Sequence, residues 1–293
     1  MKTFSIVFII AILISCNSSQ KKKMDSVEND GPVVLSKKQL SDSILMARHN
    51  HVQTDILSKN RPGLKTSEAY EIQLGMMEKE IDAGAKHIGW KMGGTATKDA
   101  AKFNPSYGYM LDRNLISEKG TIPVGHFPGG SVVVEAEVGL VLKKDMPKGV
   151  ASMEELVDNI DYIVGTIEIA KVTAISTDAS PLGINYVIAS GTGHVAAIKG
   201  HIKVKAEDFD FENESAKCYI NGKLMGEGIS SNIFGSPLNA LFHLANMLPE
   251  KNKFLKAGDL VLSGSVYTNP ELNGAGEIRV EFSTLGTITF KSE

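Results

Sequence analysis

The chain has 293 residues, of which 42% are hydrophobic and 22% are charged, and its formal net charge is −3. This is the composition of an ordinary globular protein, and the length allows a sizeable core in one large domain or two. A chain this slightly acidic offers no basic surface of the kind that binds nucleic acids, so we expect no nucleic-acid partner.

The N-terminus has the pattern of a secretory signal. Lys2 precedes an apolar run at residues 4–14, which is too short to cross a bilayer as a helix. Leu13-Ile14-Ser15-Cys16 resembles a bacterial lipobox, in which the cysteine is lipidated after cleavage; an uncleaved anchor or an ordinary signal peptide is the alternative. We therefore expect a signal peptide at residues 1–15 and a lipid anchor on Cys16. These features predict a protein anchored to a membrane of the bacterial cell envelope, outside the cytoplasm.

Residues 16–36 are polar and cannot bury enough apolar surface to fold, so we expect a flexible tether. Cys218 is the only other cysteine in the chain. With Cys16 lipidated, no intramolecular disulfide is available. Cys218 alternates with apolar residues in a strand that ends at a hairpin signal, which predicts a buried structural thiol.

Residues 37–114 are predicted to be mainly helical. Helical spacing of apolar residues runs through residues 40–57, and a second helix is expected at residues 66–84. A short apolar strand at residues 88–95 then contains Lys91. Removal from water would lower the pKa of Lys91 and suit it to carrying a proton; a lysine that extends its ammonium to the surface is the alternative.

The pattern changes after a turn expected at residues 104–108. Short strands separated by glycine and proline predict a β-rich catalytic domain over residues 115–293. A helix is expected at residues 151–160, and another begins at Ser236-Pro237, a helix cap followed by a first-turn proline.

Residues 131–142 alternate with the period of a strand. One face is wholly apolar, and the other carries Glu135 and Glu137, about 7 Å apart along the strand. Like charges that close repel each other unless a positive charge lies between them, and a hard divalent cation is the natural candidate. The alternative is a half-exposed strand whose acidic side chains face water.

A third carboxylate favours the metal. Glu168 is the only charged residue in the nearly continuous apolar strand at residues 162–170. A buried carboxylate must be paired, protonated or bound to a metal. We therefore predict that Glu135, Glu137 and Glu168 hold one cation. The chain shows no dinucleotide-binding or phosphate-binding glycine loop, no zinc-spaced histidine pair and no serine-hydrolase elbow.

Several ordered motifs between about Arg61 and Phe290 resemble the 2-keto-4-pentenoate hydratase and 4-oxalocrotonate decarboxylase branch of the fumarylacetoacetate hydrolase superfamily. The matching stretches are Ser67-Glu68-Ala69-Tyr70-Glu71-Ile72-Gln73, Gly89-Trp90-Lys91-Met92-Gly93, Pro105-Ser106-Tyr107-Gly108, Glu135-Ala136-Glu137, Ile167-Glu168-Ile169, Gly235-Ser236-Pro237-Leu238-Asn239-Ala240, Leu244-Ala245-Asn246, Leu255-Lys256-Ala257-Gly258-Asp259 and Ser263-Gly264-Ser265.

The resemblance implies an α+β protein, with an N-terminal helical segment followed by a mixed-sheet C-terminal domain like that of fumarylacetoacetate hydrolase, and a homo-oligomer. It implies Mg²⁺ (or Mn²⁺) on the three glutamates and Lys91 as the active-site lysine. It also implies that Tyr107 and Ser265 bind substrate. Gly264-Ser265, in place of the Gly-Thr-Pro usual in the hydrolase branch, favours the hydratase and decarboxylase side.

The chain departs from the family pattern after the third glutamate. Lys171 occupies the position where the family usually has an aspartate, and the Ala-Asp-Asn stretch that normally follows is not recognisable at residues 177–185.

Together with the predicted metal triad, the resemblance implies a divalent-metal-dependent hydratase that acts on a small 2-oxo acid, a 2-hydroxy-dienoate or 2-oxo-alkenoate such as 2-keto-4-pentenoate. A decarboxylase of 2-oxo acids and a hydrolase of acylpyruvates use the same metal chemistry and remain alternatives. A lipid-anchored module that binds 2-oxo acids without turnover is an alternative from another class.

Overall fold

The computed structural model of the protein describes residues 34–96, 105–176 and 182–293. Leu35–Glu293 form one compact unit. The expected signal peptide, Cys16 and most of the expected tether lie outside the described residues. Within the described ranges, no helix is both long enough and apolar enough to cross a membrane.

Among the described helices, α1, α4 and α6 begin at a serine whose side chain caps the first turn. Ser36 and Gln39 make a capping box at the start of α1, and the Ser236 hydroxyl accepts a hydrogen bond from the Leu238 N–H at the start of α6. The bounds are α1 (Lys37–His49), α2 (Ile56–Asn60), α3 (Thr66–Asp82), α4 (Met153–Asp158), α5 (Ile184–Ala189) and α6 (Pro237–Met247).

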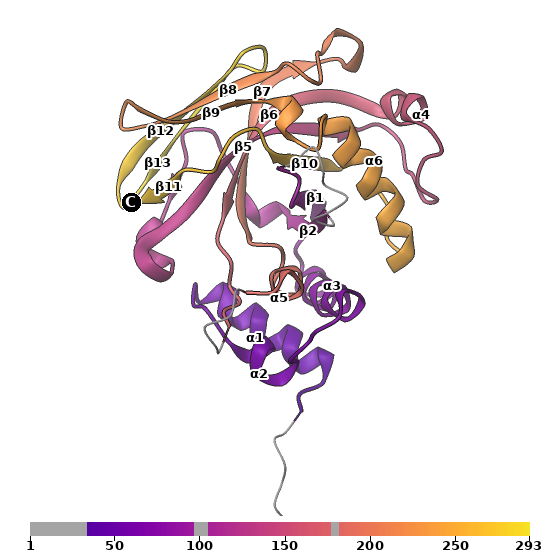
Figure 1. Ribbon diagram of the computed structural model, residues 1–293, viewed down its shortest axis with the longest axis vertical. Helices are drawn as coiled ribbons and strands as arrows, with labels where there is room; N and C mark the ends of the chain where they lie inside the picture. Colours follow the sequence, from indigo (N-terminus) through magenta and orange to yellow (C-terminus); the bar gives the residue numbers. More distant parts are fainter. Residues whose placement is uncertain (1–33, 97–104, 177–181) are drawn as a thin grey trace, which may run out of the picture. The chain divides into compact units, whose positions relative to one another are not determined.

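The single helical pattern at residues 40–57 forms two helices instead of one. α1 ends at His49, and His51 adopts a left-handed conformation with φ of 52°, which a continuing helix does not allow. α1 packs on α2 and α3, and α3 packs on α5, so these four helices gather at one end of the unit, whereas α4 and α6 lie away from them (Figure 1).

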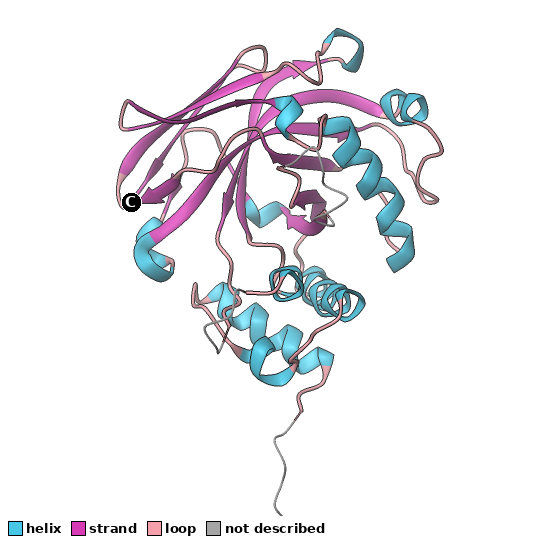
Figure 2. Cartoon of the chain, in the orientation of Figure 1, coloured by secondary structure: helices cyan, strands magenta, loops and turns pink. Residues whose placement is uncertain are grey.

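The strands form two sheets (Figure 2). Their bounds are β1 (His87–Gly93), β2 (Ser106–Leu111), β3 (Leu115–Ile116), β4 (Thr121–Ile122), β5 (Ser131–Leu142), β6 (Ile160–Ala170), β7 (His194–Val204), β8 (Ser215–Ile220), β9 (Lys223–Ile229), β10 (Leu260–Ser265), β11 (Glu271–Asn273), β12 (Gly276–Phe282) and β13 (Thr287–Ser292). The larger sheet has the order β2-β1-β10-β5-β6-β7-β3, with β11 also paired to β5. The smaller sheet has the order β4-β13-β12-β8-β9. This mixed-sheet α+β architecture confirms the predicted fold class.

The long antiparallel pair of β5 and β6 runs through the middle of the larger sheet. The predicted apolar face of β5 is almost completely buried, at Val132, Val134, Ala136, Val138 and Leu140. This burial fixes the register, since a slip by one residue would turn the whole apolar set toward the opposite face.

The boundary expected at residue 115 does not separate two compact units. β1 pairs in parallel with β10 and antiparallel with β2, so strands from residues 37–114 belong to the same sheet as β5 and β6. β2 begins at Ser106, where the sequence pattern predicts a turn. Turn-forming residues enter the strand here because pairing with β1 outweighs their local preference. Cys218, on β8, is fully buried, as predicted.

Arg48 ties the helical end to the larger sheet. Its guanidinium donates hydrogen bonds to the Ser190 carbonyl (2.7 Å) and, at the start of β7, to the His194 carbonyl (3.0 Å). It also lies over the ring of Tyr109 on β2.

We expect Arg48→Met to lower the free energy of unfolding by about 2–4 kcal/mol, because two carbonyl groups lose a charged donor. Urea unfolding of the variant and of wild type measures this change. The control is Lys38→Met on the exposed face of the same helix, which should stay within about 0.5 kcal/mol of wild type. Equal effects of the two substitutions would contradict this account of how the helices are held.

Candidate metal centre

The structure brings the three predicted carboxylates together. Glu135 on β5 and Glu168 on β6 are direct cross-strand partners, and Glu137 follows on the same face of β5. One oxygen from each of the three side chains lies within 4.8 Å of the other two. Glu137 and Glu168 are fully buried, whereas Glu135 is partly exposed. The strand pairing therefore concentrates three acidic groups in a site nearly closed to water.

A backbone donor holds Glu137. Its Oε2 accepts a hydrogen bond from the Gly264 N–H at 2.7 Å, and its Oε1 is buried without a hydrogen-bond partner among the described residues. Gly264 lies at an irregularity between β10 and β5 and has a φ of 112°. A Cβ at this position would overlap the Thr95 hydroxyl. Only glycine therefore lets the chain turn this N–H toward the carboxylate.

Glu135 lies where β5 changes its neighbour. β10 pairs with β5 as far as Ser265 opposite Glu137, and β11 resumes the pairing at Val133. The chain between these two strands brings back Asn269, whose Nδ2 donates to Glu135 Oε1 at 2.6 Å. The interruption of the sheet thus leaves Glu135 open to a cavity on one side.

Two nitrogens lie against Glu168. Nδ1 of His194 is 2.8 Å from its Oε1, and Nζ of Lys91 is 3.1 Å from its Oε2. The sequence reasoning did not identify His194, which reaches Glu168 only because β7 pairs with β6. Hydrogen-bond partners such as these orient the side chains that bind a metal and tune its affinity.

Lys91 is inside the site and not at the surface. Its side chain is 4% exposed, and its ammonium donates to the Thr192 carbonyl at 3.1 Å besides contacting Glu168. The alternative of a surface-directed ammonium is therefore wrong. Burial alone would lower the pKa of Lys91, but the charges of Glu168, Glu135 and Glu137 outweigh burial and leave this pKa above its ordinary value. The neighbouring carboxylates therefore reverse the lowering of the Lys91 pKa that the sequence predicts.

The acidic groups favour a positive charge in addition to Lys91. Burial and the charge of Glu168 raise the pKa of Glu135 to about 7 and the pKa of Glu137 well above its ordinary value. Burial acts in the same direction on Glu168, but Lys91 and His194 keep the pKa of Glu168 below its ordinary value. Carboxylate oxygens are the ligands that hard divalent cations prefer, and the free Oε1 of Glu137 adds an available one. The three side chains fit such a cation.

A cavity of about 520 Å³ opens beside the carboxylates, lined by Lys91, Glu135, Ser265 and Asn269, among others. The Ser265 hydroxyl is buried and has no hydrogen-bond partner within the described ranges, so it is available to a bound molecule. The cavity therefore combines a metal-binding side chain, a lysine and an unsatisfied hydroxyl.

Tyr107, expected to bind substrate, does not line this cavity. Its ring is 1% exposed, stacks on Tyr70 and meets the edge of Trp90. Side chains alternate along β2, so its neighbour Ser106 lines the cavity instead. The structure gives Tyr107 a packing role, with its carbonyl accepting hydrogen bonds from Gln73 and Thr192.

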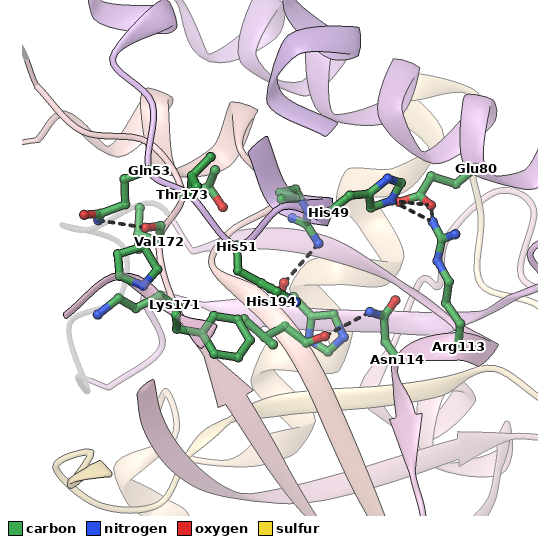
Figure 3. A pocket seen from close by; sticks show the side chains of 15 residues that line it. His49, His51, Gln53, Glu80, Arg113, Asn114, Lys171, Val172, Thr173 and His194 are labelled. Carbon is green, nitrogen blue, oxygen red and sulfur yellow. Dashed lines mark hydrogen bonds and ion pairs between the residues drawn. The ribbon is translucent and has the colours of Figure 1, made fainter. Parts of the chain in front are cut away.

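A second cavity of about 350 Å³ lies next to the first (Figure 3). Arg48, Arg113 and His194 are among its lining residues, and Lys171 and Val172 line both cavities. Figure 3 shows the Lys171 side chain extending away from His194. The segment that follows β6 thus forms a wall between the two cavities.

The fold and the carboxylate cluster define an α+β protein with a candidate metal centre on the central strands of a mixed sheet. The chain matches the family model described as fumarylacetoacetate (FAA) hydrolase C-terminal over residues 83–291. This match covers more than half of the chain, and the chain belongs to the FAA hydrolase family.

Characterised relatives are similar at low identity. A 2-keto-4-pentenoate hydratase from Paraburkholderia xenovorans (strain LB400) is 26% identical over 240 residues, which are 76% of this chain and 86% of that protein. A 4-oxalocrotonate decarboxylase from Pseudomonas putida is 22% identical over 269 residues, 91% of this chain and 98% of that protein. The structure of a 4-oxalocrotonate decarboxylase from Pseudomonas putida G7, complexed with magnesium and adipate, has the same fold with a TM-score of 0.81. It is 21% identical, and the alignment covers 88% of this chain and 97% of that chain.

We expect Glu137→Gln to weaken the binding of Mn²⁺ by about a hundredfold or more, because the site loses a charged ligand that no neighbour can replace. Isothermal titration calorimetry with Mn²⁺ and with Mg²⁺ measures this loss. Glu227→Gln on the exposed strand β9 is the control and should bind both metals like wild type. Unchanged affinity in Glu137→Gln would exclude the triad as the metal site.

The raised pKa of Glu135 predicts a pH dependence that depends on metal. A carboxyl with a higher pKa in the folded state binds more protons there, so the metal-free protein loses stability as the pH rises from about 4.5 through 7. The loss should be on the order of 1–3 kcal/mol, since each unit of pKa shift corresponds to about 1.4 kcal/mol.

Urea unfolding between pH 5 and pH 8, with EDTA or with Mg²⁺, tests this expectation. Mg²⁺ favours the ionised carboxylates, so its stabilising effect should grow with pH. Parallel stability curves in the two buffers would show that these carboxylates do not bind the cation.

Proposed function

We propose that this protein is a hydro-lyase that adds water to a small 2-hydroxy-dienoate or 2-oxo-alkenoate such as 2-keto-4-pentenoate, with Mg²⁺ or Mn²⁺ at Glu135, Glu137 and Glu168. The observation that carries the proposal is the cluster of three carboxylates with a buried lysine, beside a cavity that Glu135 and Lys91 line. Membership of the FAA hydrolase family and the hydratases among its relatives support it.

The three carboxylates would hold a divalent cation at the end of the cavity that receives the substrate carboxylate and 2-oxygen, and without that cation they would repel this end of the substrate. A divalent cation bound there supplies Lewis acidity to these substrate oxygens. Ser265 offers its unpaired hydroxyl as a hydrogen-bond donor inside the same cavity. Because the site is largely closed to solvent, each of these polar contacts is stronger than it would be in water.

Lys91 is the group placed to move protons. Its Nζ lies at the cavity with Glu168 and the Thr192 carbonyl as fixed partners, so its position is set before substrate binds. Because the raised pKa of Lys91 keeps Nζ protonated, the ammonium would first deliver a proton to the terminal carbon of the dienol and then take up the proton of the 2-hydroxyl group as ketonisation completes. Water then adds across the remaining alkene and gives a 4-hydroxy-2-oxo acid. A positioned general acid–base of this kind contributes about 10²–10⁴-fold to a rate.

A decarboxylase is the second candidate. The 4-oxalocrotonate decarboxylase from Pseudomonas putida aligns with 91% of this chain, a larger share than the hydratase does. The same carboxylate cluster and lysine would serve the loss of CO₂. Product analysis separates the two reactions, because one yields a hydroxylated acid and the other releases CO₂.

The cellular setting is also a proposal. The lipobox-like sequence before Cys16 supports a lipid-anchored protein of the bacterial cell envelope, outside the cytoplasm. We further propose that the protein works as a homo-oligomer, as the family resemblance implies. Labelling with a radioactive fatty acid, compared with a Cys16→Ala variant, tests the anchor, and analytical ultracentrifugation of the chain from Asn17 tests the assembly.

The decisive experiment follows the ultraviolet absorbance of 2-hydroxypenta-2,4-dienoate with the protein from Asn17 onward, in Mg²⁺ or in EDTA. We expect loss of the dienol in Mg²⁺ only, with the 4-hydroxy-2-oxo acid as product. Lys91→Met should reduce kcat by at least about a hundredfold while Mn²⁺ still binds. The control Lys223→Met, an exposed lysine on β9, should retain full activity.

Failure would take two distinguishable forms. Tight Mg²⁺ binding without turnover of any 2-oxo acid would favour the module that binds such acids without chemistry. Absence of metal binding would remove the metal centre and the hydratase with it.

A further inference from the structure

We propose that Lys171 binds the distal carboxylate of a dicarboxylic 2-oxo acid, and that this contact sets the substrate class of the cavity. The inference rests on the proposed function and changes its preferred substrate from the monocarboxylate named there to a dicarboxylate. 2-Keto-4-pentenoate has one carboxylate, whereas 4-oxalocrotonate has two, and the metal ligands alone do not discriminate between them.

Lys171 lines the cavity that contains Glu135 and Lys91. It directly follows β6, and its backbone N–H donates to the Gly193 carbonyl at 2.7 Å, which fixes the start of the side chain. Its Nζ donates to the Ser131 hydroxyl at 3.1 Å. The ammonium therefore has a defined position at the first residue of β5.

The charge of Lys171 is not neutralised by the described residues. No carboxylate oxygen in the described ranges lies within 4 Å of its Nζ, although the side chain is only partly exposed. Glu271 faces Val133 across the β5–β11 ladder, but it is exposed and makes no ion pair with Lys171. A half-buried ammonium whose one observed partner is a neutral hydroxyl favours an anion supplied by a ligand.

Glu135 and the serine that holds the Lys171 ammonium lie on one strand face. Ser131, Val133 and Glu135 alternate along β5 and point to the same side. The Cα atoms of Ser131 and Glu135 are therefore about 13 Å apart at the usual rise of a strand. An extended chain of six or seven carbons covers about 6–8 Å with standard bond lengths of about 1.5 Å. The groups that bind its two ends account for the remaining distance.

The wall between these ends suits a carbon chain. Val133 lies between Ser131 and Glu135 on this strand face and lines the cavity together with Ala170 and Val172. A molecule whose 2-oxo acid end binds at Glu135 would lay its apolar middle on these side chains and bring a second carboxylate to the ammonium. A five-carbon monocarboxylate places no charge there, so it gains nothing from Lys171.

The test compares 2-oxoadipate with 2-oxohexanoate, which have the same chain length and differ only in the distal carboxylate. Calorimetric titration of each into the Mg²⁺-loaded protein measures binding without requiring turnover. We expect wild type to bind 2-oxoadipate about tenfold to a hundredfold more tightly, the range expected for one charge-assisted hydrogen bond.

Three variants test whether Lys171 causes the preference for 2-oxoadipate over 2-oxohexanoate. Lys171→Met should abolish it by weakening 2-oxoadipate alone, Lys171→Arg should retain most of it, and the exposed control Lys223→Met should behave as wild type. Unchanged binding of 2-oxohexanoate by Lys171→Met shows that the site is folded.

Other outcomes overturn the inference in distinguishable ways. Equal binding of the two acids by wild type, or a preference that survives in Lys171→Met, would exclude the role of Lys171 and leave the proposed function standing. Equal loss of both acids in Lys171→Met would show that the lysine acts on the metal centre instead. Binding of neither acid by wild type would overturn the proposed function as well.

Discussion

Two carboxylates face each other across neighbouring buried strands, and the rest of the site compensates for that arrangement. Like charges in direct cross-strand register destabilise a sheet, and burial adds to the cost. The pairing of Glu135 with Glu168 is nevertheless fixed, because the apolar face of β5 is packed into the core and allows no slip of register. The pair is therefore maintained by the packing around it. The resulting negative potential attracts the Lys91 ammonium and favours the binding of a cation.

The neighbours of the carboxylates come from segments far apart in the sequence. Gly264 supplies an N–H from β10, His194 reaches Glu168 from β7, and Lys91 arrives from β1. β1 belongs to the part of the chain that looks helical in sequence, yet it pairs with β10 at the centre of the larger sheet. Arg48 then holds α1 against β7. The site consequently needs the whole unit, and the segment before residue 115 is not a removable appendage.

The strands that carry the ligands could be predicted because their side-chain patterns are local. Alternation along β5 and the single charge in β6 identified Glu135, Glu137 and Glu168 from the sequence. His194 could not be found this way, since it meets Glu168 through a strand pairing that no short motif encodes. Tyr107 has the surroundings of a family motif, but alternation along β2 turns its ring into the core. Burial of Lys91 depends on carboxylates from other strands, which a local pattern does not reveal.

The change of neighbour along β5 affects how this fold can diversify. β10 and β11 share one edge of β5, and the five residues between them cross in front of Glu135 without belonging to either ladder. Val266 and Pro270 hydrogen-bond to β5, but Thr268 and Asn269 are exposed and can change while those hydrogen bonds remain intact. Asn269 shows that this crossover reaches the metal ligands directly. A protein built this way can acquire new selectivity at the rim of the site while the costly acidic pair beneath it remains unaltered.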